Sequence, residues 1–284
     1  MKKNVLFLIG LALLVPLVII LSSEENPTSV SQTSKALQGK LIITGSSTIA
    51  PLAQEMAKQF ESSYPNVRVD VQTGGSSRGI SDVRRSLTHI GMVSRQLKAS
   101  EQDLTAHKIA MDGVTLIVHQ QNPVTQLTDD QIRAMYTGKF SNWTDLGGTD
   151  NPITVINKAE GRSTLEVFLG YFGLKNQQIK PDIVIGDNEQ AIKLVAQNPH
   201  AIAYVSIGTG EYSQQHGVPI KLLAINGIAA SSHNVNQATF PITRELNFIT
   251  HGIPNKLSLA FIEFAQSPAT FPLIKAQSFV PLTP

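Results

Sequence analysis

Cysteine is absent from all 284 residues of the chain. This absence excludes disulfide bonds, thiol catalysis, cysteine-ligated zinc and lipid attachment through an N-terminal cysteine. An excess of charge is absent as well. The formal net charge is +2, and Lys2 and Lys3 account for it, because the rest of the chain carries 21 basic and 21 acidic residues. A balanced chain without basic runs has no electrostatic footprint for nucleic acid, so we expect no nucleic-acid partner.

Several catalytic motifs are also missing. The chain has no Gly-x-x-x-x-Gly-Lys-Ser/Thr phosphate loop, no His-Glu-x-x-His zinc motif and no Gly-x-Ser-x-Gly nucleophile elbow. Its seven histidines are scattered, and no two of them have the spacing of metal ligands. We therefore expect no metal site, no cofactor and no enzymatic activity.

The N-terminus has the pattern of an export signal. Lys2 and Lys3 precede an apolar run over residues 5–21, which Pro16 interrupts, and a polar stretch rich in Ser, Thr and Glu follows. A positive start before an apolar segment of this length is typical of a signal peptide or a short membrane anchor, and both remain open. We predict that residues 1–22 form this segment, that residues 23–38 form a linker, and that the remainder lies outside the cytoplasm.

From residue 39 onward, the chain alternates short apolar runs with segments of helical periodicity, as in an α/β protein. The apolar pattern predicts strands at residues 41–43, 67–71 and 90–93. It predicts helices between them at residues 49–60 and 80–83. This order predicts a mostly parallel sheet. Ligands of such sheets bind beyond the carboxyl ends of the strands. Further strands are expected at residues 114–119, 153–156, 183–185, 201–205, 221–225 and 246–249, and a helix at residues 257–265.

Two helix starts carry the spacing of a capping box, in which an N-cap hydroxyl and a Glu or Gln three residues later exchange hydrogen bonds with the backbone. Thr128 with Gln131 predicts one such start, and Ser163 with Glu166 predicts another.

Three loops share one chemistry. Each is a Gly-Ser/Thr segment between an expected strand and an expected helix: residues 45–48, 74–77 and 161–164. Glycine allows backbone N–H groups to approach a ligand, hydroxyls add donors, and the following helix N-terminus attracts negative charge. Taken singly, each loop is equally well explained as an ordinary turn. Together they predict a site that surrounds a small oxyanion.

Two arginines add positive charge near these loops. Arg162 lies at a helix N-terminus, where a bound anion would explain a cation, and Arg95 follows Ser94 directly after a strand. The alternatives are a solvated surface side chain for Arg162 and a surface ion pair for Arg95. The candidate ligand-binding residues are Ser46, Ser47, Thr48, Ser76, Ser77, Ser94, Arg95, Arg162, Ser163 and Thr164.

The ordered set of motifs resembles the phosphate-binding subunit of bacterial ABC importers. The resemblance runs from Gly39 to the C-terminus and rests on TGSST (44–48), GGSSRGI (74–80), IGMVSR (90–95), DGV (112–114), GKFSNW (138–143), EGRST (160–164), AIAYVS (201–206) and FPITR (240–244). It implies a two-lobed periplasmic-binding-protein fold of type II, with a mostly parallel sheet in each lobe and a ligand cleft between the lobes. Residues 39–114 and 247–284 would form the first lobe, and residues 115–246 the second.

The same resemblance implies a function. The protein would be a monomeric, periplasmic or otherwise extracytoplasmic binding protein that captures inorganic phosphate and passes it to ABC permease subunits in the inner membrane. Lys158 stands where many relatives carry an arginine. Where some phosphate binders have an aspartate that accepts the ligand's proton, this chain has Ser94, so Glu160 or Asp82 would have to substitute. A membrane-anchored oxyanion sensor, a binding protein for another oxyanion and a phosphatase of related fold are the alternatives.

Overall fold

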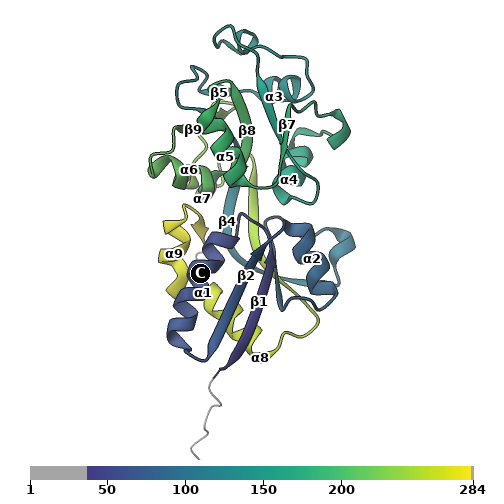
Figure 1. Ribbon diagram of the computed structural model, residues 1–284, viewed down its shortest axis with the longest axis vertical. Helices are drawn as coiled ribbons and strands as arrows, with labels where there is room; N and C mark the ends of the chain where they lie inside the picture. Colours follow the sequence, from purple (N-terminus) through teal and green to yellow (C-terminus); the bar gives the residue numbers. More distant parts are fainter. Residues whose placement is uncertain (1–36, 283–284) are drawn as a thin grey trace, which may run out of the picture. The chain divides into compact units, whose positions relative to one another are not determined.

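The computed structural model describes residues 37–282 (Figure 1). The predicted signal segment and most of the predicted linker lie outside these residues. The described chain begins with the predicted strand–helix alternation, which is confirmed: β1 (Gly39–Gly45), α1 (Ala50–Ser63), β2 (Val67–Thr73), α2 (Ser76–Arg84) and β3 (Ile90–Val93). β1 pairs in parallel with both β2 and β3. The carboxyl ends of these strands therefore meet at one edge of the sheet.

Two long strands connect this part to the next. β4 (Leu104–His119) and β11 (Thr243–His251) pair antiparallel, from Thr243 opposite Gly113 to His251 opposite Leu104. β11 also pairs antiparallel with β3. The sheet is therefore mixed, because the two connecting strands oppose the parallel strands beside them.

The second part is built on β8 (Ala201–Ser206), which pairs antiparallel with β4 and parallel with β6 (Thr154–Lys158). β7 (Ile183–Ile185) extends the sheet in parallel. The other elements here are β5 (Gln126–Leu127), α3 (Asp129–Tyr136), η2 (Trp143–Leu146), α4 (Ser163–Phe172), η3 (Asn176–Gln178), α5 (Asn188–Gln197), α6 (Ile207–Gln215), β9 (Ile220–Leu222), β10 (Ala224–Ile225) and α7 (Ser232–Asn236). The remaining elements are η1 (Ala99–Glu101), α8 (Lys256–Gln266), η4 (Pro268–Thr270), α9 (Phe271–Ala276) and β12 (Val280–Pro281).

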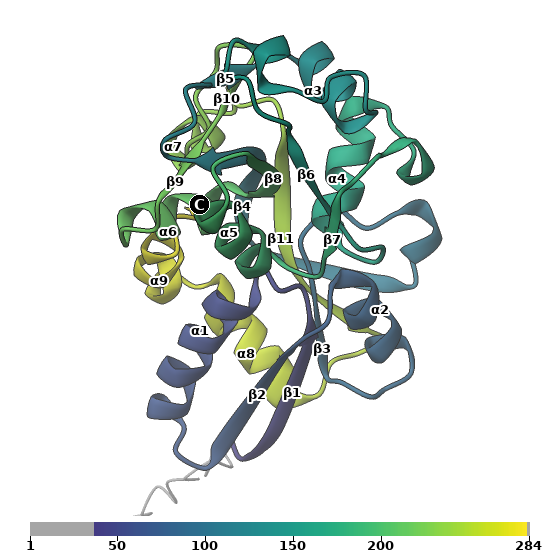
Figure 2. The ribbon, with the colours of Figure 1, turned by 45° about the horizontal axis from the view of Figure 1, so that its top comes forward.

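The two parts have separate hydrophobic cores, and we call them the first and second lobes. One core lies among β1, β3, α1 and α8 and includes Leu41, Met56 and Phe261. The other lies among β4, β8, α3 and α4 and includes Tyr136 and Phe168. Figures 1 and 2 show β4 and β11 running from one lobe into the other.

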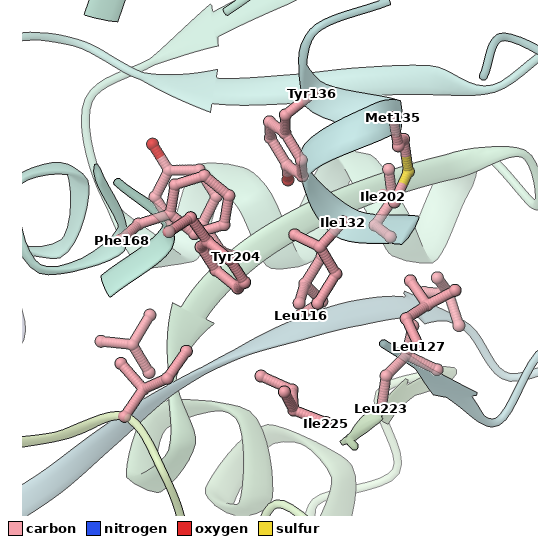
Figure 3. Close-up of a cluster of buried hydrophobic side chains, with 14 of the residues drawn as sticks. Leu116, Leu127, Ile132, Met135, Tyr136, Phe168, Ile202, Tyr204, Leu223 and Ile225 are labelled. Atoms are coloured by element: carbon pink, nitrogen blue, oxygen red, sulfur yellow. The ribbon is translucent and has the colours of Figure 1, made fainter. Parts of the chain in front are cut away.

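Aromatic packing in the second lobe helps to position the end of β6. Tyr204 stacks on Phe168 with ring centroids 4.1 Å apart, and both rings lie in the cluster drawn in Figure 3. The buried Tyr204 hydroxyl accepts a hydrogen bond of 3.1 Å from the backbone N–H of Lys158. The core therefore fixes the backbone of the residue at which β6 ends.

Two details differ from the sequence predictions. The expected strand over residues 221–225 is divided at Leu223, because β9 pairs with β4 whereas β10 pairs with β5. The strand expected at residues 114–119 is the end of a longer one, since β4 begins at Leu104. Within residues 37–282, no single helix has the length and apolarity to cross a membrane. By those two criteria alone α8 and the η4–α9 segment pass together, with a 63° bend between them.

Candidate anion site

The three Gly-Ser/Thr loops converge on one place in the structure. Ser46 and Thr48 lie in the turn between β1 and α1, Ser76 opens α2, and Ser163 and Thr164 open α4. All five side chains are buried. The loops belong to different lobes, so the hydroxyl groups face a shared space from both sides.

This space is a small cavity of about 220 Å³, including the part open to solvent. It is lined by Ser46, Ser47, Thr48, Gly75, Ser76, Ser94, Lys158, Arg162, Ser163, Thr164, Gly186, Asp187 and Asn188. Hydroxyl, amide and cationic groups dominate this lining, and Asp187 contributes the one carboxylate in it. Such a donor set suits a small anion, because desolvating an anion is costly unless many donors replace its water.

Two buried donors at the cavity have no hydrogen-bond partner among the described residues: Lys158 Nζ and Ser163 Oγ. Lys158 is 2 % exposed. Burial chiefly, together with the nearby positive charges of Arg244 and Arg162, lowers the pKa of Lys158 to about 7, and Asp187 partly offsets this shift. An unpaired cation in this setting is costly, and an anion in the cavity would neutralise it.

A buried ion pair lies beside the cavity, where β4 and β11 pair and Arg244 is opposite Asp112. Arg244 Nη2 lies 2.8 Å from Asp112 Oδ2, and both side chains are 1 % exposed. The same guanidinium donates to Thr164 Oγ1 at 2.9 Å and to Thr48 Oγ1 at 3.3 Å. Arg244 therefore orients hydroxyls of both lobes. The Asp112 carboxylate is therefore held in an ion pair within the fold and does not line the cavity.

Other contacts join the lobes directly around the cavity. Asn188, the first residue of α5, donates to Thr48 Oγ1 at 3.2 Å. The backbone N–H of Ser77 donates to the carbonyl of Gly161 at 3.2 Å. These bonds cross between the loops of the first lobe and those of the second, so the structure represents a closed arrangement of the two lobes.

Glycine is required where β1 turns into its loop. Gly45 has a φ of +134°, and a Cβ there would lie 2.4 Å from the carbonyl oxygen of Met92. The turn can therefore pass close to β3 only without a side chain at this position. The close approach brings Ser46 Oγ to 3.0 Å from Ser94 Oγ.

The geometry does not support two of the predicted ligand-binding residues. Neither Arg95 nor Ser77 lines the cavity. The Arg95 guanidinium forms a bidentate ion pair with Glu101, at 2.7 and 2.9 Å, and also contacts Glu166. The Ser77 side chain is exposed, and this residue meets the second lobe through its backbone. The alternative of an ion-paired arginine describes Arg95, although the pair is buried.

One of the two capping boxes is also corrected. The Thr128–Gln131 box is confirmed. At α4 the N-cap is Arg162, without a side-chain cap, so Ser163 is the first helical residue and its hydroxyl remains unpaired toward the cavity. Glu166 instead points its carboxylate to cations of the first lobe.

The two carboxylates considered as proton acceptors lie away from the cavity. Glu160 accepts a hydrogen bond from Asn176, and Asp82 pairs with Arg78 at 3.2 Å. Asp187 and Asn188, which line the cavity, were not among the predicted site residues. The sequence signal at this point is a strand ending at Ile185 just before an Asp-Asn helix start. Among residues 37–282, no group of three or more His, Asp or Glu side chains has an arrangement that could hold a metal ion.

Comparison with known proteins identifies relatives along most of the chain. A family model described as "PBP superfamily domain" matches residues 30–269. The chain is 28 % identical over 295 residues to the phosphate-binding protein PstS of Bacillus subtilis, covering all of this chain and 96 % of the relative. It is 26 % identical over 280 residues to PstS of Pseudomonas aeruginosa, covering 88 % and 85 %.

Two solved structures resemble the fold closely. One, from Clostridium perfringens, is described as a candidate phosphate ABC transporter substrate-binding protein with bound phosphate. It superposes with a TM-score of 0.81 at 29 % identity, over 86 % of this chain and all of that one. An ABC-type phosphate transport receptor from Vibrio cholerae superposes with a TM-score of 0.71 at 27 % identity, over 85 % of this chain and all of the other.

Proposed function

Because the chain belongs to the PBP superfamily domain family, we propose that it captures inorganic phosphate in the cavity between its lobes and delivers it to an ABC importer. The named relatives with which it shares nearly its whole length are phosphate-binding proteins. The cavity has the donor chemistry for a small tetrahedral oxyanion. The ligand-binding residues proposed are Ser46, Ser47, Thr48, Ser76, Ser94, Lys158, Arg162, Ser163 and Thr164.

The observation that carries this proposal is the pair of unpartnered buried donors, Lys158 Nζ and Ser163 Oγ. A buried polar group without a partner costs about 1–3 kcal/mol, and more when it is charged. Phosphate oxygens would accept hydrogen bonds from both groups, so binding would remove this cost and strengthen the affinity for phosphate. The N-termini of α1, α2 and α4 would each add roughly 0.3–1 kcal/mol of attraction for the anion.

The mechanism proposed is reversible capture without covalent chemistry. Donors from both lobes surround the cavity, so the ligand would favour the closed arrangement over one in which the lobes separate. We propose residues 39–114 with 247–284 as one moving body and residues 115–246 as the other. We further propose that the protein is a monomer outside the cytoplasm and that permease subunits recognise its closed form.

The test is substitution of two cavity residues outside the buried ion pair. Arg162→Ala and Ser163→Ala should each weaken phosphate binding by about tenfold or more, because each removes a donor at the N-terminus of α4. Arg85→Ala and Ser213→Ala are matched controls, since both residues lie outside the cavity, and both should bind as the unmodified protein does. Unchanged affinity in both cavity variants would contradict the assignment.

A further inference from the structure

Glu166 makes an unusual set of contacts for a residue in the first turn of a helix. It belongs to α4 of the second lobe, yet its carboxylate reaches the first lobe. Its Oε2 lies 2.6 Å from Arg95 Nε and 2.8 Å from Lys98 Nζ. The Arg95 contact is an ion pair rather than an aligned hydrogen bond, because the two atoms are close but do not satisfy each other's hydrogen-bonding geometry.

Arg95, which forms an ion pair with Glu166, is held rigidly within the first lobe. Glu101 binds the Nη1 and Nη2 atoms of the Arg95 guanidinium, and the Arg95 side chain is only 7 % exposed. Asn247 donates to the Arg95 carbonyl at 3.0 Å. The Arg95 hydrogen bond is the largest influence on Glu101 and holds the pKa of that carboxyl below its ordinary value. Arg95 is therefore a fixed, buried positive charge that does not need Glu166 to stay in place.

Glu166, in contrast, has no side-chain partner in its own lobe among the described residues. The expected exchange with Ser163 is absent, because α4 is capped without a side chain. All the ion pairs of this carboxylate therefore cross between the lobes. They exist in the closed arrangement and would be lost when the lobes separate.

The position of this contact ties it to the cavity. Arg95 follows Ser94, which lines the cavity from the first lobe, and Glu166 follows Ser163 and Thr164, which line it from the second. An attraction between Arg95 and Glu166 therefore draws two groups of anion donors toward the same space. The carboxylate does this without touching the cavity itself.

We propose that Glu166 is a positioning residue, a latch that favours closure by pairing with Arg95 and Lys98 across the lobes. The link of this latch to phosphate affinity rests on the proposed function. The effect of the latch on closure does not rest on the proposed function, because its ion pairs join protein groups only. The latch acts after the ligand has entered, so it slows dissociation more than it changes association.

The experiment compares Glu166→Gln with Glu189→Gln. The control is matched, because Glu189 is also an acidic residue in the first turn of a helix that opens on the cavity, but it is exposed and forms no ion pair among the described residues. Phosphate dissociation rates are measured by stopped flow. Because the chain has no cysteine, a distance between spin labels at Ser62→Cys and Gln197→Cys reports lobe separation in each background.

Loss of a largely buried charge partner predicts about tenfold faster phosphate dissociation for Glu166→Gln, with unchanged association. It also predicts a shift of the label distance toward longer values at equal phosphate. Thermal unfolding of the ligand-free protein should change little, which separates a latch from a merely structural residue. Glu189→Gln should match the parent in every measurement.

Equal dissociation rates and equal distances for Glu166→Gln and its parent would overturn the latch. If the parent protein binds no phosphate, the proposed function fails instead. The distance distributions in buffer then decide the latch alone, since Glu166→Gln must still shift toward separation, and identical distributions would refute it.

Discussion

At the scale of single residues, the site combines groups that the sequence identifies with groups that only the fold brings near. The hydroxyls of Thr48, Ser76 and Ser163 were predicted from their Gly-Ser loops, because a glycine turn before a helix has a local signature. Arg95 has the same local signature as a ligand-binding arginine, but its nearest carboxylates decide its role. Glu101 lies six residues further along the chain, and Glu166 reaches Arg95 from the other lobe.

Lys158 leads to a prediction about stability and pH. Its pKa is about 7 in the folded protein, against an ordinary value of 10.5. Below pH 7 the lysine is charged in both states, so the full cost of burying it applies. Between pH 7 and 10.5 the unfolded chain holds a proton that the folded chain releases, so the free energy of unfolding rises with pH.

Lys158→Met should therefore stabilise the ligand-free protein, and by more at pH 6 than at pH 9. Thermal unfolding at both pH values measures this, with Lys193→Met, an exposed lysine of α5, as the control. The same stabilisation at both pH values would mean that Lys158 does not carry a buried charge.

Asp187 leads to a prediction about selectivity. It is the carboxylate in the cavity lining, where it would repel a fully ionised tetrahedral anion and accept a proton from phosphate. Sulfate has no proton to donate at neutral pH. Asp187→Asn should therefore reduce the preference for phosphate over sulfate by about tenfold or more, because the repulsion and the acceptor are both lost.

Competition between the two anions, measured by calorimetry, checks this expectation. Asparagine caps a helix about as well as aspartate, so the cap on α5 that Asp187 provides through Gln190 is retained. An unchanged preference would assign the discrimination to another group.

At the scale of elements, local patterns predicted most strands and the helices α1, α4 and α8, because each has a clear apolar period, whereas α5 was not predicted. Strands over residues 183–185 and 201–205 appear as β7 and β8. The pattern failed where tertiary pairing decides. The chain changes sheets at Leu223. The helix α6 has too little amphipathicity to be recognised, since three of its four buried residues are Gly208, Gly210 and Ser213.

The loop before α2 leads to a prediction about closure. Gly75 has a φ of +93°, and a Cβ there would lie 2.8 Å from the Gly161 carbonyl oxygen of the opposite lobe. Gly75→Ala should weaken phosphate binding by about tenfold or more, because backbone rather than a flexible side chain blocks the added carbon.

Gly217→Ala is the control for the cost of a positive φ, since Gly217 has a φ of +82° and no atom within 4 Å of an added Cβ. It should lower the melting temperature but leave phosphate affinity intact. If Gly75→Ala, like Gly217→Ala, lowers the melting temperature but leaves phosphate affinity intact, the close approach of the two loops does not contribute to binding.

At the scale of the whole described chain, two lobes with separate cores share β4 and β11, and the cavity lies where donors of both lobes meet. The order of motifs along the sequence was enough to anticipate this architecture. It was not enough to place Arg244, whose contacts with Asp112, Thr48 and Thr164 join segments up to 196 residues apart. No local pattern encodes a contact of that separation.

Phosphate capture by the cavity is tested by calorimetric titration of the purified protein, stripped of bound ligand, with inorganic phosphate and then with sulfate. We expect tight 1:1 binding of phosphate that sulfate does not match, because the cavity supplies donors for an oxyanion and one carboxylate for its proton. Equal binding of the two anions, or binding of neither, would contradict it.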